Sequence, residues 1–280
     1  MREIHVDQII ETVKYMCIDA NCNLNRDVQC ALEQGLAREQ NATAKTMLTD
    51  ILKNAEIARN EQMPICQDTG MAVIFLKLGQ DVHMTGGSLY DAVNEGVRQG
   101  YAEGYLRKSV VADPVRRGNT GDNTPAVIHT EITDGEHLEI TLAPKGFGSE
   151  NMSAVKMCKP SDGLDGIIDF VVDTVRRAGG NPCPPLVVGV GIGGTFEKCA
   201  YLAKSALLRD VDSSNPDPYY AELEATLLER INALDIGPQG FGGVTTALGV
   251  NVETFPTHIA GMPCAVNINC HVTRHLTKTL

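Results

Sequence analysis

The sequence contains no tryptophan, few aromatic residues and less positive than negative charge. Its 280 residues include 24 lysines and arginines against 35 aspartates and glutamates, so the formal net charge is −11. No basic run could neutralise a phosphate backbone, so we expect no nucleic-acid partner. No apolar run approaches the length of a bilayer span, and residues 1–7 contain no apolar signal segment. We therefore expect a cytoplasmic protein without membrane contact.

Paired cysteine motifs are also missing. The nine cysteines are odd in number, which excludes complete internal pairing, and none forms a C-x-x-C pair of the kind found in zinc ribbons. A chain of this size can bury a core without disulfides. We expect reduced thiols, and any bound metal would take its ligands from loops that are distant in sequence.

Apolar periodicity predicts a mixed α/β fold that begins with helices. Apolar residues repeat at helical spacing over 6–17, 26–39 and 43–59, and we expect residues 1–62 to form a helical layer. We expect residues 63–280 to form an α/β region of the same domain, with a soft boundary between the two. Further helices are predicted over 88–107, 166–178, 196–208 and 217–234.

Short apolar runs between these helices predict the strands. They cover 71–78, 126–133, 137–143, 186–190, 244–253 and 264–270. Asp134-Gly135 separates two of the runs and is typical of a hairpin turn. The sheet should therefore be mixed and partly antiparallel, with helices flanking it.

Four polar, glycine-containing segments each lie beside a predicted strand. They are Pro64–Gly70, Arg116–Pro125, Lys145–Asn151 and Pro256–Gly261. A rigid scaffold can present such loops to a shared cleft. Taken singly, each is also typical of ordinary turn chemistry.

Two of the motifs resemble sites that the rest of the chain does not support. Asp68-Thr69-Gly70 occurs only once, whereas an aspartic protease needs two such carboxylates. The segment Gly189–Gly194 fits the G-x-G-x-x-G pattern of dinucleotide sites, but Asp210 continues a helical pattern instead of ending a second strand. A tight helix–strand contact is favoured, and a non-catalytic dinucleotide-binding module remains the alternative from another class.

Three cysteines lie where metal ligands are often found. Cys66 and Cys183 belong to proline-flanked loops, and Cys270 closes a predicted strand. Thiolates on such fixed loops suit metal ligation, although a free cysteine is also a common small core residue. Cys158 and Cys264 remain open as alternatives on spacing alone.

Together these segments closely resemble the class I, iron–sulfur fumarate hydratase family, specifically its α subunit. The resemblance runs from about Ile9 to Leu276. It is carried by Cys66-Gln-Asp-Thr-Gly, Leu106-Arg107-Lys-Ser-Val-Val, Asn119-Thr-Gly-Asp-Asn-Thr-Pro, Lys145-Gly-Phe-Gly-Ser-Glu-Asn, Gly191-Ile-Gly-Gly-Thr and the segment from His258-Ile-Ala-Gly to Cys270-His271. The α subunit of L(+)-tartrate dehydratase, a close relative, is the alternative.

The resemblance implies a [4Fe-4S] cluster held by Cys66, Cys183 and Cys270. Three thiolates leave one iron without a protein ligand, free to act as a Lewis acid on a substrate hydroxyl. The implied reaction is the reversible hydration of fumarate to L-malate.

The same resemblance implies the residues that meet the small dicarboxylic acid substrate. Asp68 matches an active-site acid that contacts substrate, either as the catalytic base or as a positioning group, and the remaining matches are substrate-binding positions. These are Gln67, Arg107, Gly148 and His258. The family's site also uses groups from a further C-terminal domain, so we expect a β subunit and an α2β2 assembly.

Overall fold

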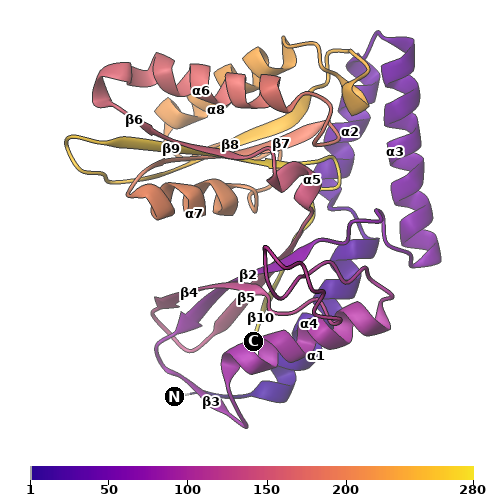
Figure 1. The fold of residues 1–280 in the computed structure, drawn as a ribbon, viewed down its shortest axis with the longest axis vertical. Helices are drawn as coiled ribbons and strands as arrows, with labels where there is room; N and C mark the ends of the chain where they lie inside the picture. Colours follow the sequence, from indigo (N-terminus) through magenta and orange to yellow (C-terminus); the bar gives the residue numbers. More distant parts are fainter. Residues whose placement is uncertain (1) are drawn as a thin grey trace. The chain divides into compact units, whose positions relative to one another are not determined.

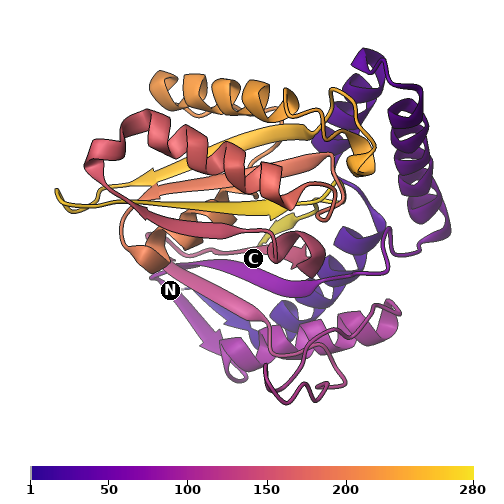
Figure 2. The ribbon, with the colours of Figure 1, turned by 45° about the horizontal axis from the view of Figure 1, so that its top comes forward.

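The computed structural model describes residues 2–280, which divide into two compact units (Figures 1 and 2). Unit 1 comprises residues 2–24, 55–147 and 274–280, and unit 2 comprises residues 25–54 and 148–273. The expected soft boundary near residue 62 does not coincide with these divisions, because the first helices pack on different sheets. In the described part of the chain, no helix combines the length and apolar character needed to cross a bilayer.

Unit 1 packs two helices against a four-stranded sheet of order β10-β5-β2-β4. The helices are α1 (Val6–Cys22) and α4 (Leu89–Glu103), and the strands are β2 (Met71–Gly79), β4 (Val127–Thr133), β5 (Leu138–Lys145) and β10 (Leu276–Thr279). The apolar face predicted for α1 is buried in the core beside β2 and β5. A separate parallel pair, β1 (Arg2–His5) with β3 (Val82–Thr85), is not anticipated by the sequence pattern.

The prediction of a hairpin around Asp134-Gly135 is wrong, because the strands on either side of this turn do not pair with each other. Strand β2 lies between β4 and β5, parallel to β4 and antiparallel to β5. The end of β2 and the residues after it bond to the connection between β4 and β5: Gly79 N donates to His137 O, and Asp81 N donates to Gly135 O. The connection therefore spans β2, and the expected antiparallel pairing is found between β2 and β5.

Unit 2 is built on a second mixed sheet, of order β6-β9-β7-β8. Its strands are β6 (Ala154–Cys158), β7 (Leu186–Gly193), β8 (Ala247–Phe255) and β9 (Met262–Asn269). Helices α6 (Gly163–Ala178) and α8 (Pro218–Asn232) cover one face, and α7 (Phe196–Ala206) covers the other (Figure 1). Helix α2 (Arg26–Arg38) also belongs to this unit, and α3 (Ala42–Glu61) runs from unit 2 into unit 1.

Strand directions in unit 2 decide which loops share an end of the sheet. Strand β7 is parallel to β8 and antiparallel to β9, with Val187 opposite Asn269. The start of β7 therefore lies beside the end of β9. The loop between β8 and β9 lies at the opposite end.

The segment that precedes β2 has a buried backbone that side chains hold in place. The Tyr101 hydroxyl donates to the carbonyls of Thr69 and Gly70, at 2.8 and 2.9 Å. Asn123, which is fully buried, adds an Nδ2 bond to Gly70 O at 3.2 Å and accepts from Ser109 N at 2.7 Å. Buried carbonyls need such donors because water does not reach them.

Replacing Tyr101 by phenylalanine should destabilise the protein by about 1–3 kcal/mol, because two buried carbonyls lose a donor. The free energy of unfolding, measured by urea titration, tests this. Tyr105→Phe is the matched control: Tyr105 is 93% exposed and should change stability by less than about 0.5 kcal/mol. Equal stabilities of the two variants would contradict the anchoring role.

A half-buried ion pair ties α8 to the sheet of unit 2. Arg209 Nη1 donates to Glu224 Oε1 at 2.7 Å and reaches Glu253 Oε1 at 3.4 Å. The Glu224 carboxylate also accepts from Val252 N and from Asn215 N, both at 2.8 Å. The Glu224 carboxylate thus accepts hydrogen bonds from a backbone N–H of β8, from a backbone N–H before α8 and from the Arg209 guanidinium.

Glu224→Gln should cost about 3 kcal/mol, because it leaves Arg209 without its buried counter-charge. Glu253→Gln changes the more exposed partner of the same arginine and should cost less than about 1 kcal/mol. Denaturant midpoints of the two variants check the difference. A larger loss of stability in Glu253→Gln than in Glu224→Gln would mean that the more exposed ion pair contributes more to the free energy of unfolding.

Candidate active site

The loop before β2 places a thiol and a carboxylate two residues apart. Cys66 and Asp68 are half-buried, and Gln67 between them is exposed. Asp68 N donates to Cys66 Sγ at 3.4 Å, and Sγ also lies 3.4 Å from Gln67 Oε1. The Cys66 sulfur, the atom through which a cysteine binds metals, is thus held between a backbone N–H and a side-chain amide oxygen.

The Asp68 carboxylate joins this loop to the segment after β5. Its Oδ1 accepts from Gly70 N at 3.0 Å, and its Oδ2 accepts from Phe147 N at 2.9 Å. Gly70 has φ +76°, and a Cβ there would stand 2.7 Å from Lys145 N, so only glycine fits this approach. Two of the predicted polar segments therefore meet in unit 1, and the carboxylate has a fixed orientation.

Arg107 lies beside the same loop. Its carbonyl accepts from Thr69 Oγ1 at 3.2 Å, and the residue is exposed. Unit 1 thus brings together Cys66, Gln67, Asp68 and Arg107, all predicted from the sequence.

The Arg116–Pro125 segment shows the turn chemistry that its residues also predict. Asp122 Oδ1 accepts from Thr124 N at 3.0 Å, and Oδ2 accepts from Arg98 Nε at 3.0 Å. The backbone bond from Thr124, with further bonds from the Thr124 hydroxyl and Arg98, lowers the pKa of Asp122 to about 2. The segment contributes to the site through Asn123, which bonds the carbonyl of Gly70.

Unit 2 brings Cys183 close to the segment of Cys270. The Cys183 carbonyl accepts from His271 N at 3.3 Å and lies 2.9 Å from His271 Nδ1. Gln239 Nε2 lies 3.2 Å from the same imidazole nitrogen and donates to Pro184 O at 2.8 Å. Cys183 is exposed and Cys270 is half-buried. This arrangement follows from the antiparallel pairing of β7 with β9.

Gly148 is exposed on the short helix α5 (Phe147–Glu150). A Cβ at Gly148 would stand 4.0 Å from Asn181 O, in the loop that leads to Cys183. Lys204 Nζ on α7 donates to Glu150 Oε1 at 2.5 Å, and Asn267 Nδ2 on β9 donates to Glu150 Oε2 at 2.8 Å. These bonds hold α5 against the sheet.

His258 does not join Cys183 and Cys270 within unit 2. It lies exposed in the β8–β9 loop, where its Nδ1 accepts from Ala260 N at 3.2 Å. Strand β9 separates this loop from Cys270, and its eight residues span about 26 Å. A substrate-binding role for His258 stays a prediction.

The other cysteines considered as ligands lie in the core of unit 2. Cys158 and Cys264 are buried among aliphatic residues of β7, β8 and α6. Burial raises the pKa of both thiols, which disfavours the thiolate. Neither offers a better ligand than Cys183.

The thiols expected to hold a cluster are divided between the units, with Cys66 in unit 1 and the other two in unit 2. Within either unit, the described residues contain no group of three His, Cys, Asp or Glu able to hold a metal ion. The donor chemistry nevertheless fits an iron–sulfur group: all three thiols lie outside the apolar cores, and Cys66 Sγ accepts a backbone N–H.

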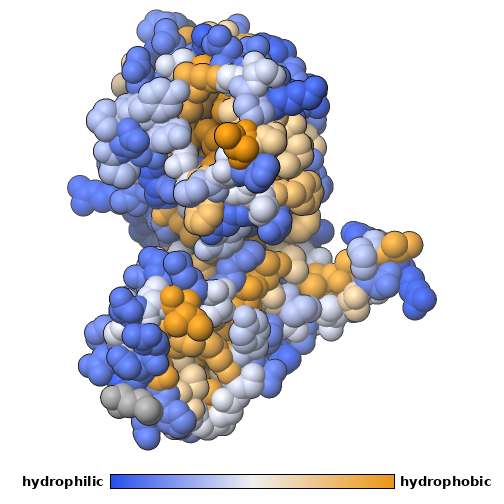
Figure 3. All heavy atoms as spheres, turned by 90° about the vertical axis from the view of Figure 1, so that its left-hand side faces the viewer, coloured by the Kyte–Doolittle hydropathy of each residue, from blue (hydrophilic) through white to orange (hydrophobic). Residues whose placement is uncertain are grey.

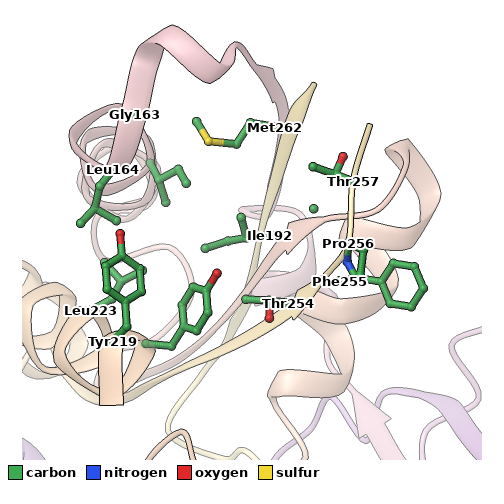
Figure 4. Close-up of a pocket in the computed structure, with 13 residues that line it drawn as sticks. Gly163, Leu164, Ile192, Tyr219, Leu223, Thr254, Phe255, Pro256, Thr257 and Met262 are labelled. Carbon is green, nitrogen blue, oxygen red and sulfur yellow. The ribbon is translucent and has the colours of Figure 1, made fainter. Parts of the chain in front are cut away.

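A cavity of about 500 Å³ lies in unit 2 among α6, α8 and the ends of β7 and β8 (Figure 4). Figure 3 shows apolar residues gathered on this face of unit 2. The cavity is lined by Gly163, Leu164, Ile167, Ile192, Gly193, Tyr219, Tyr220, Leu223, Thr254, Phe255, Pro256, Thr257 and Met262. None of these carries a charge, so the cavity lacks what a dicarboxylate requires.

The Gly189–Gly194 motif serves packing. A Cβ at Gly189 or Gly191 would stand 2.1 Å from a carbonyl of α7, so these glycines let the helix lie directly on β7. Helix α7 ends at Ala206, slightly earlier than expected, and Asp210 follows in a turn instead of ending a strand. The geometry gives no support to a dinucleotide site.

Sequence reasoning missed three residues that position the site. Tyr101 looks like part of an apolar helix face, and Asn123 lies inside a turn motif. Arg274, four residues after Cys270, donates from Nη2 to Asp68 O at 2.7 Å. Its only sequence signal is a basic residue within an otherwise uncharged stretch.

Comparison with known proteins identifies the family. The model of the family described as fumarate hydratase (Fumerase) matches residues 10–279. The chain is 41% identical over 278 residues to a putative L(+)-tartrate dehydratase subunit alpha from Methanocaldococcus jannaschii, covering 98% of both chains. It is 32% identical over 275 residues to the L(+)-tartrate dehydratase subunit alpha of Escherichia coli, covering 97% of this chain and 90% of that one. The chain therefore belongs to the fumarate hydratase family of hydro-lyases.

Proposed function

We propose that this chain is the α subunit of a [4Fe-4S]-dependent hydro-lyase that interconverts fumarate and L-malate. The observation that carries the proposal is the Cys66–Gly70 loop, which fixes a thiol, a carboxylate and the neighbouring Arg107 backbone in one unit. Family membership supports the reaction class.

Cys66, Cys183 and Cys270 would hold the cluster. When bound, the cluster would supply Lewis acidity toward the hydroxyl group that is lost or gained. Within this chain an N–H bond to Sγ fixes the Cys66 thiol, and the pairing of β7 with β9 brings the segments of Cys183 and Cys270 together.

Asp68 would be the acid–base group of this chain. Two backbone N–H bonds fix its carboxylate without occupying all of its lone pairs, so either oxygen can still accept or return a proton. Arg107, exposed beside it, would pair its guanidinium with a substrate carboxylate. Gln67 and the backbone of Gly148 would add polar contacts.

A β subunit would complete the site. The relatives are named alpha subunits, which supports a partner of another kind, and we propose an α2β2 assembly in the cytoplasm. His258 lies at the end of the unit 2 sheet remote from Cys270. In the proposed assembly, the site where His258 meets substrate would therefore be a different copy from the site that contains Cys183 and Cys270 of the same chain.

L(+)-tartrate is the second candidate substrate. The specific observation in its favour is the name carried by the relatives at 41% and 32% identity. Tartrate has the same two carboxylates and one additional hydroxyl, so the groups assigned here would bind either acid.

Anaerobic purification with the β subunit should give about four iron atoms and four sulfides per α chain. Serine substitution at Cys66, Cys183 or Cys270 should each remove most of the iron, because an alcohol is a poor ligand for it. Iron and acid-labile sulfide assays provide the measurement.

Cys30→Ser is the matched control, since Cys30 is a half-buried cysteine on α2 outside the proposed set. It should retain the full complement of iron. A Cys183→Ser variant that keeps its cluster would remove Cys183 from the ligand set, and iron-free wild-type protein would refute the proposed cofactor.

Substrate choice should appear as a ratio of kcat/KM values. We expect L-malate to be preferred over L(+)-tartrate by about a hundredfold, which is the scale on which one added hydroxyl is discriminated. Arg107→Lys is the control: it should lower both values by a similar factor, because both acids carry the carboxylate that it binds. A ratio in the opposite direction would make tartrate the substrate.

A further inference from the structure

Arg274 is a buried cation attached to the cysteine loop of unit 1. The residue is only 3% exposed, and its Nη2 donates to the Asp68 carbonyl at 2.7 Å. That carbonyl belongs to the residue whose N–H is directed at Cys66 Sγ. The guanidinium and the thiol are therefore separated by a single residue of backbone.

The charge of Arg274 has no carboxylate partner among residues 2–280. Its Nε is buried and makes no hydrogen bond, and no aspartate or glutamate of the described chain lies within ion-pair distance. Arg209 of unit 2 shows the usual arrangement, in which Glu224 and Glu253 surround the guanidinium. A buried guanidinium without an anion is costly, so its presence points to an anion supplied from outside the chain.

The guanidinium of Arg274 lies close to the Cys66 thiol. Arg274 Nη2 bonds to Asp68 O, and Asp68 N bonds to Cys66 Sγ, so the distance from Arg274 Nη2 to Cys66 Sγ is at most about 10 Å. The field of Arg274 also reaches Cys22: burial raises the pKa of that thiol, and Arg274 opposes the rise. A charge at this distance whose own side chain is buried is screened less by water than a surface charge would be.

We propose that Arg274 is a positioning residue that holds the Cys66–Gly70 loop by its bond to Asp68, and that its counter-charge is the iron–sulfur cluster. The inference rests on the proposed function. A cluster ligated by three thiolates is anionic, and it becomes more negative on reduction. Arg274 should therefore stabilise the reduced cluster in particular.

The test is the reduction potential of the cluster in the αβ complex, followed by EPR during a redox titration. Arg274→Gln should shift the potential negative by about 59 mV, which corresponds to a tenfold change in the one-electron equilibrium. Arg274→Lys keeps the charge and should recover at least half of that shift. Arg177→Gln, at an exposed arginine on α6, should leave the potential unchanged.

A second variant removes the same charge with an unbranched apolar side chain of similar length. Arg274→Met should also shift the potential negative, because it likewise leaves the cluster without this cation. This variant decides the matter if Arg274→Gln does not fold.

The outcomes separate this inference from the proposed function. Iron-free wild-type protein overturns both. A wild-type cluster whose potential is unchanged by Arg274→Gln and by Arg274→Met overturns the inference alone, since a purely structural arginine would affect cluster content without affecting the potential of the clusters that remain.

Discussion

Three consecutive backbone carbonyls, those of Asp68, Thr69 and Gly70, are held by side chains, and the geometry of the site depends on these bonds. The donors come from distant segments: Tyr101 on α4, Asn123 in a turn, and Arg274 near the C-terminus. With its carbonyls bonded inward, the loop cannot rotate to solvate them. Its remaining groups, the Cys66 thiol and the Asp68 carboxylate, are thereby fixed before any ligand arrives, which is how a rigid scaffold lowers the entropy cost of binding and chemistry.

The sequence predicted elements better than it predicted their pairing. Helices such as α1 and α6 bury one apolar face, so a 3.6-residue period reveals them. The hairpin signal at Asp134-Gly135 describes only a turn. Strand β2, which lies about 60 residues earlier in the sequence, pairs with both β4 and β5 and separates them. A local sequence pattern does not predict which distant strand will pair with a given strand. For the same reason the helices before residue 62 could be located, but their division between two sheets could not.

The candidate site shows a similar limit. Polar loops next to strands drew attention to the segment of Cys66 and Asp68, because glycine and polar residues gather where the backbone must turn. Arg107 and the role of Asp68 were indicated only by the resemblance to the family. Tyr101 and Arg274 could not be found in this way, since each acts through a hydrogen bond to a backbone carbonyl that leaves no pattern in sequence. His258 is different: the apolar run 264–270 already implies that it and Cys270 lie at opposite ends of one strand.

Charge explains why such a site needs buried cations in this protein. The chain carries a net charge of −11, which opposes the approach of an anionic substrate at long range, although salt screens much of this field. Beside the Cys66 loop, by contrast, Arg274 is buried, and so is Lys145, whose ammonium donates to Gly146 O at 3.3 Å. Buried cations act at short range, where screening is weak. An oxidised cluster held by three thiolates, a dicarboxylate and the Asp68 carboxylate together carry one more negative charge than Arg274, Lys145 and Arg107 can balance, which gives a physical reason for a β subunit that contributes further cations to the proposed site.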